Sequence, residues 1–96
     1  MLIDKGVTVG EVITLKLTSG EELVARLVEE TSTYYKLSHT KVIGMGESGP
    51  GLMPYLFTVH PSKEIKLLKT TVTVAESTDE VFAKQFLQTT SAIKLL

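Results

Sequence analysis

Two adjacent tyrosines and a lysine are the residues of this sequence best suited to bind another molecule: Tyr34, Tyr35 and Lys36. Aromatic rings stack on nucleic-acid bases, and a lysine ammonium group contacts the phosphates between them. These three residues could therefore form a platform for single-stranded nucleic acid. The alternative interpretation is that Tyr35 belongs to the hydrophobic core, while Tyr34 is a half-exposed aromatic residue of a strand.

Lys69 is a fourth candidate, because lysines recur at every third position and could line one rim of the molecule: Lys63, Lys66 and Lys69. Alternation along a strand would instead place Lys66 on the face opposite the other two. The lysines would then be part of an ordinary solvated surface. The candidate nucleic-acid-binding residues are Tyr34, Tyr35, Lys36 and Lys69.

Catalytic and metal chemistry have few suitable residues. The sequence has no cysteine, which excludes disulfides, thiolate nucleophiles and Cys-based metal sites. Its histidines are His39 and His60, and its two aspartates, Asp4 and Asp79, lie near the termini. Because no carboxylate is placed to orient a Ser–His pair, we expect no enzyme activity. With two histidines and no cysteine we expect no metal site, and we expect no cofactor.

Length and composition indicate one globular domain. The chain has 96 residues, of which 43% are hydrophobic and 22% charged, and its net charge is −1. A nearly neutral chain has no overall field that attracts nucleic acid or an anionic membrane, so polyanion binding needs a local cluster. No apolar run approaches the ~20 residues of a membrane span, and the N-terminus lacks the features of a secretion signal. We expect a cytoplasmic protein without membrane contact.

The first part of the chain has the two-residue period of β-strands. Residues 12–17 alternate between apolar and polar side chains, and the polar turn that follows contains Gly20. Alternation resumes over residues 21–30, which we interpret as a second strand. Leu23 and Leu27 also fit one face of a helix, which is the competing interpretation.

The middle of the chain continues the β pattern. A third strand is predicted over residues 33–38, with Tyr35 and Leu37 on one face, and Val42 and Ile43 could extend it after a bend. Four glycines fall within residues 44–51, which predicts a mobile loop. Further extended segments are expected at 52–59, 64–68 and 72–74.

The last part of the chain has a helical period. Ser77 and Glu80 form a capping box, and Phe82 and Phe86 recur at helical spacing. We expect this helix to pack on the strands, with a neighbouring subunit as the alternative. The predicted fold is a small all-β barrel with a C-terminal α-helix, in one domain made of an arm at 1–10, a barrel at 11–75 and a helix at 77–90.

The predicted strands resemble the Sm-like (LSm) family. The first family motif is matched by Leu15-x-Leu17-x-x-Gly20-x-x-Leu23-x-Ala25-x-Leu27 and then Tyr35-x-Leu37. The second motif is matched more loosely by residues 67–72, where Lys69 takes the basic position and Thr70 the position of a glycine. The chain is also similar to divergent Sm-like proteins of tailed phages, which share the Gly-Glu-Glu hairpin, the Met-Pro-Tyr stretch at 53–55 and a terminal helix.

This resemblance implies a strongly bent, antiparallel, five-stranded barrel whose edge strands pair with neighbouring copies in a ring of about five to seven subunits. Family members that bind uridine-rich RNA use an Asn at the start of the third strand, and this sequence has no Asn. The alternation of the strand places Tyr34 at that position, and a one-residue shift in the preceding loop would place Tyr35 there instead. A tyrosine can stack on a base, but it cannot make the paired hydrogen bonds of an amide.

We therefore expect a homo-oligomeric, ring-forming Sm-like protein that binds RNA or another single-stranded nucleic acid without catalysis. The alternative is an oligomeric scaffold or protein-interaction module that has lost the RNA site. A phage origin would place the protein in the host cytoplasm.

Overall fold

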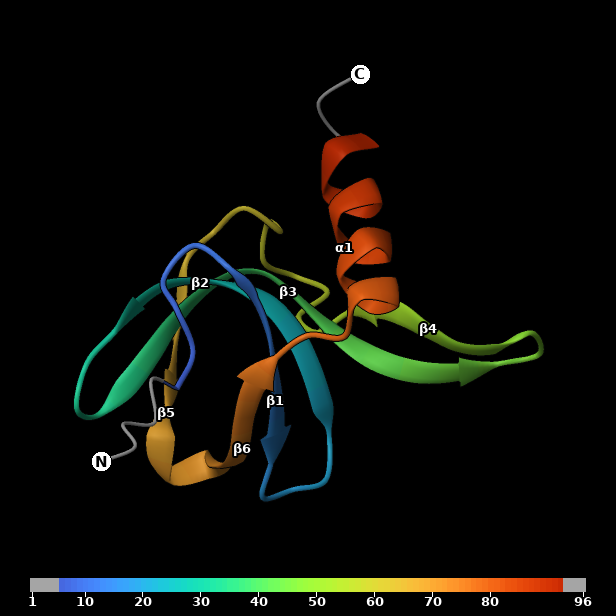
Figure 1. Ribbon diagram of the computed structural model, residues 1–96. Helices are drawn as coiled ribbons and strands as arrows, with labels where there is room; N and C mark the ends of the chain where they lie inside the picture. Colours follow the sequence, from blue (N-terminus) through green and yellow to red (C-terminus); the bar gives the residue numbers. More distant parts are fainter. Residues whose placement is uncertain (1–5, 93–96) are drawn as a thin grey trace.

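The computed structural model describes residues 6–92, which form one antiparallel β-sheet followed by one helix (Figure 1). Residues 1–5 of the expected N-terminal arm lie outside the described residues. In chain order the elements are β1 (Val12–Leu17), β2 (Glu22–Glu30), β3 (Tyr34–Gly46), β4 (Gly49–Pro54), β5 (Ile65–Leu68), a 3-10 turn (Lys69–Thr71), β6 (Val72–Ser77) and α1 (Glu80–Ala92).

The long strand β3 connects most of the sheet. One of its edges pairs with β2, whereas the other pairs with β5 along residues 34–37 and with β4 along residues 41–46. His39 lies between these two halves and has a φ of 53°. The predicted extension of the third strand after a bend is therefore confirmed.

The expected fold is confirmed in its class and wrong in two details. The domain is an antiparallel β-sheet with a C-terminal helix, as predicted. It has six strands rather than five, in the order β4-β3-β2-β1-β6 with β5 also paired to β3. The sheet is not closed, because β5 and β6 do not pair with each other.

The prediction of a mobile loop over residues 44–51 is wrong, because β3 continues to Gly46 and the additional strand, β4, begins at Gly49 and runs to Pro54, into the expected extended segment 52–59. These residues form a hairpin in which Gly46 lies opposite Gly49. Gly49 has a φ of 111°, a conformation that residues with a side chain rarely adopt. At Gly44, an added Cβ would collide with the sulfur of Met53. The glycines are thus used for a tight turn and a close contact within a regular β-ribbon.

The main cluster of buried apolar residues occupies one face of the sheet and consists of the alternate residues Ile13, Leu15, Leu17, Leu23, Ala25, Leu27 and Leu37. Val24 is also fully buried, on the opposite face. Leu23 lies opposite Leu15, and Ala25 lies opposite Ile13. The strand interpretation of residues 21–30 is therefore confirmed, and the helical alternative is wrong. A helix would bring Leu23 and Leu27 together, but it would turn Ala25 away from them.

The helix begins later than the predicted capping box. Ser77 is the last residue of β6, and its hydroxyl donates a hydrogen bond to Glu11 Oε2 at 3.0 Å. Asp79 is the capping residue instead, because its Oδ2 accepts a hydrogen bond from the backbone N–H of Val81 at 3.2 Å. The predicted helix is present. It begins at Glu80 rather than directly after Ser77, because β6 continues as far as Ser77.

α1 is held to the domain by a narrow apolar stripe and rises beside the β3–β4 ribbon (Figure 1). Phe86 is fully buried, whereas Val81 is 69% exposed and Leu87 is 41% exposed. Phe82 borders a groove that Val24 and Ile43 also line. Much of the apolar surface of α1 is therefore left uncovered by its own sheet.

Phe86→Ala is expected to detach α1 and leave the sheet folded. Removal of a fully buried phenylalanine usually costs about 3–5 kcal/mol, and an isolated helix of this length is marginal in water. Amide hydrogen exchange should show loss of protection in α1 and retention in β1–β3. Leu87→Ala is the matched control and should keep α1 protected. Unchanged protection of α1 in Phe86→Ala would contradict this account of its docking.

Candidate nucleic-acid interface

Tyr34 and Tyr35 lie on opposite faces of the sheet. Tyr34 is paired with Leu68 across the β3–β5 ladder, and Tyr35 is paired with Leu67. Tyr35 and Leu67 pack against the hydrophobic core. Tyr34 is half-buried on the other face, as expected for a strand in which successive side chains alternate.

Each tyrosine ring has a lysine ammonium group close to its face. Lys66 Nζ lies 5.1 Å from the ring centroid of Tyr34, and Lys69 Nζ lies 4.9 Å from that of Tyr35. Both distances are within the range of cation–π attraction. Lys66, which was not among the predicted site residues, therefore accompanies Tyr34.

Two of the candidate cations also have carboxylate partners. Lys69 Nζ lies 2.7 Å from Glu30 Oε2. Lys36 Nζ lies 3.4 Å from Glu29 and 4.0 Å from Glu64. Exposed ion pairs contribute only about 0–1 kcal/mol, so a phosphate could displace these carboxylates at small cost.

The four candidates thus form two groups. The outer group is Tyr34 and Lys36, which share one face of β3 with Lys66, the residue opposite Lys36 in β5. The inner group is Tyr35 and Lys69, at the edge of the core. A single nucleic-acid base cannot contact both groups, because the sheet separates the two rings.

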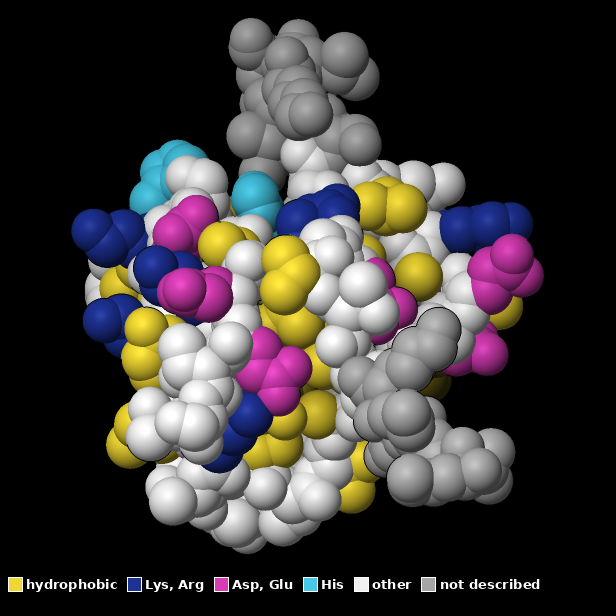
Figure 2. Space-filling model, turned by 60° about the vertical axis from the view of Figure 1, so that its left-hand side comes forward, with side chains coloured by type: hydrophobic (Ala, Val, Ile, Leu, Met, Phe, Trp, Pro, Cys, Tyr) yellow, Lys and Arg dark blue, Asp and Glu magenta, His cyan; other side chains and the backbone are white. Residues whose placement is uncertain are grey.

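Charges of both signs are mixed on the surface. In Figure 2, dark blue lysine and arginine side chains lie next to magenta carboxylates, and no large area of one sign is seen on that face.

The pKa of the Glu21 carboxyl is lowered, because the Ser19 hydroxyl and then the backbone N–H of Glu21 donate hydrogen bonds to it. Ser19 and Glu21 belong to the turn before β2. This turn lies at one end of β2, whereas Glu30 and the tyrosines lie at the other end.

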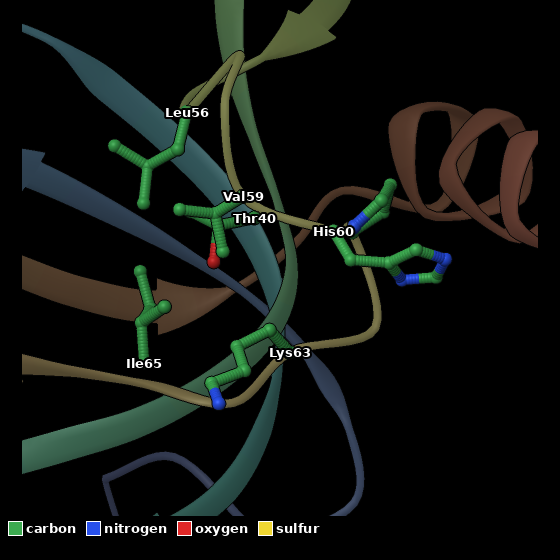
Figure 3. Close-up of a pocket in the computed structure, with 7 residues that line it drawn as sticks. Thr40, Leu56, Val59, His60, Lys63 and Ile65 are labelled. Carbon is green, nitrogen blue, oxygen red and sulfur yellow. The ribbon is translucent and has the colours of Figure 1, made fainter.

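The histidines take part in local contacts. His60 Nδ1 lies 2.8 Å from Ser62 Oγ and accepts a hydrogen bond from the backbone N–H of Ser62 at 3.1 Å. In Figure 3 the His60 ring points away from the apolar side chains of Leu56 and Ile65, with which it lines a small pocket. The His60–Ser62 pair stabilises a turn, and no carboxylate is hydrogen-bonded to the His60 ring within residues 6–92.

Two further absences apply to residues 6–92. No three histidine, aspartate or glutamate side chains come together there in a way that could hold a metal ion. The helix of this region is too short and too polar to cross a bilayer.

Two exposed apolar residues at sheet edges were not among the predicted site residues. Leu68 in β5 is 55% exposed, and Val74 in β6 is 49% exposed. β5 pairs on one side with β3, and β6 on one side with β1. The second edge of each strand has no strand partner among the described residues. The signal was present in the sequence as apolar residues on the polar face of two short strands.

Comparison of the sequence with models of known protein families finds no match, and comparison with curated proteins finds none either.

Tyr35→Ala is expected to destabilise the fold, whereas Tyr34→Ala is not. Tyr35 contributes to the core, so its truncation should lower the free energy of unfolding by about 2 kcal/mol. Tyr34→Ala should change it by less than about 0.5 kcal/mol, a typical effect of a surface substitution. Urea denaturation of both variants measures the difference. Equal losses would show that both rings serve the core and that neither is available as a binding surface.

Proposed function

We propose that this chain is a self-assembling Sm-like domain in which β5 of one copy pairs with β6 of the next to form a ring. The observation that carries the proposal is that β5 and β6 each pair on one side only among the described residues, and that each carries an exposed apolar residue, Leu68 and Val74. An open edge with apolar side chains is a template for another strand. Repetition of one such head-to-tail contact by rotation closes a ring.

The curvature of the sheet supports an Sm-like assignment. Without β4, the strands follow the order β5-β3-β2-β1-β6, which is the number of strands that the resemblance implies. β5 and β6 lie at opposite ends of this order, yet only the three residues Lys69–Thr71 separate them in the chain. The sheet must therefore bend strongly to bring its two ends together. The β3–β4 ribbon is then an addition to a five-stranded unit.

Val74→Lys is expected to abolish the oligomer without unfolding the chain. A lysine on an edge strand opposes pairing with a further strand, and Val74 is half-exposed, so the monomer should tolerate the change. Native mass spectrometry should show one discrete oligomer, of about five to seven copies, for the unaltered chain and a monomer for the variant. Val9→Lys is the control, because Val9 is 59% exposed but precedes β1. A monomeric unaltered chain, or an unchanged oligomer in Val74→Lys, would refute edge pairing.

A second candidate function is the binding of single-stranded RNA to the outer group. Tyr34 is partly exposed, and Lys36 and Lys66 lie on its face of the sheet. In an oligomeric ring, this combination of an aromatic side chain for base stacking and cations for phosphates would recur once in every subunit. A ring that binds no RNA would act instead as a scaffold.

Tyr34→Ala/Lys36→Ala is expected to weaken RNA binding about tenfold, because base stacking on an aromatic side chain contributes about 1–3 kcal/mol. Fluorescence anisotropy with short uridine-rich and adenine-rich RNAs measures the affinity. Lys16→Ala, on β1, controls for the loss of a positive charge. Equal affinity of all three proteins would remove the outer group as the site, and no binding by the unaltered chain would favour the scaffold.

A further inference from the structure

We infer that the contact between copies is antiparallel and has one defined register, in which Val74 lies opposite Leu68 and Glu76 lies opposite Lys66 of the next copy. This inference rests on the proposed assembly and adds the residues that specify it. It follows from the faces on which the edge residues lie and from their charges.

The side chains of β6 have known faces because β6 is paired with β1. Val74 lies opposite Lys16 and Glu76 lies opposite Thr14, both on the face away from the core. Ala75 lies opposite Leu15, on the core face. Val74 and Glu76 are therefore the outer-face residues that β6 offers to a neighbouring strand.

The faces of β5 follow from its pairing with β3. Lys66 and Leu68 share the outer face with Tyr34, whereas Leu67 lies opposite Tyr35 on the core face. Directly opposed residues of antiparallel strands lie on the same face of a sheet. A sheet that continues from one copy to the next must therefore pair Val74 and Glu76 with outer-face residues of β5.

One register gives favourable pairs at both positions. With Val74 opposite Leu68, two exposed apolar side chains cover each other, and Glu76 then lies opposite Lys66. Opposed apolar or oppositely charged side chains each contribute roughly 0.2–1 kcal/mol. Within residues 6–92, the Glu76 carboxylate has no ion pair or hydrogen bond of its own that would compete.

The two neighbouring registers that preserve the faces are unfavourable. A shift of two residues one way places Glu76 opposite Glu64, and like charges directly opposed repel. A shift the other way places Glu76 opposite Leu68 and leaves Val74 beside Thr70. Only the inferred register avoids both defects.

Cysteine cross-linking tests the register directly, because the natural sequence has no cysteine. In Leu68→Cys/Val74→Cys, opposed Cα atoms fall within the distance that a disulfide spans. Mild oxidation should give a ladder of covalent oligomers on a non-reducing gel, up to the number of copies in the ring. Thr70→Cys/Val74→Cys is the matched control for the shifted register and should give at least tenfold less cross-linked product.

The outcomes separate the two proposals. An unaltered chain that is monomeric by native mass spectrometry would overturn the assembly and the register together. An unaltered chain that assembles, combined with a ladder in the control or in neither variant, would overturn the register alone. A ladder that is specific to Leu68→Cys/Val74→Cys is the expected result.

Charge exchange provides a second test that does not depend on disulfide formation. Glu76→Lys and Lys66→Glu should each weaken assembly about tenfold, because each places like charges opposite one another. The double variant Glu76→Lys/Lys66→Glu restores opposite charges and should recover the size distribution of the unaltered chain at the same concentration. Failure of the double variant to recover, while it keeps the circular dichroism of the unaltered chain, would contradict the Glu76–Lys66 pair.

Discussion

The short connection between β5 and β6 constrains the rest of the structure. These strands lie at the two ends of the five-strand order, and three residues join them. The turn is fixed on both sides, since Thr71 O accepts a hydrogen bond from Thr18 N at 2.8 Å and Lys69 N donates one to Thr33 O at 2.8 Å. It thereby ties the β1–β2 turn to the start of β3. The sheet has to curve around its core, and within residues 6–92 neither β5 nor β6 has a second strand partner.

The core could be predicted from the sequence, because the pattern that specifies it lies within single strands and the short turn between two of them. Alternation of leucines with polar residues in β1 and β2 decides which side is buried, and the pairing of Leu15 with Leu23 follows from the short turn between them. The glycine-rich ribbon and the helix start could not be predicted in the same way. Glycine permits both a loop and a tight hairpin, and the strand partner of Ser77 lies more than sixty residues away in β1.

The candidate site was predictable only in part for the same reason. The alternation of β3 already separates Tyr34 from Tyr35, so their division between two faces follows from the sequence. The partners of the lysines do not follow from it. Lys69 meets Glu30 across a separation of 39 residues, and this contact exists only because the strongly bent sheet brings the 3-10 turn to the end of β2. Because Lys36 and Lys69 are paired with carboxylates, the surface around the lysines carries charges of both signs.

Assembly and nucleic-acid binding make different demands on the sequence. Edge pairing uses main-chain hydrogen bonds, which every residue except proline can supply, so it survives wide changes in side chains. Base recognition needs a particular amide or ring at a particular position, and one substitution removes it. A chain without the asparagine of the RNA-binding members can therefore keep the ring and lose the base contact. In the proposed assembly, apolar and charged residues on the outer face of the edges, Leu68 with Val74 and Lys66 with Glu76, would be the features that specify a second copy as the partner.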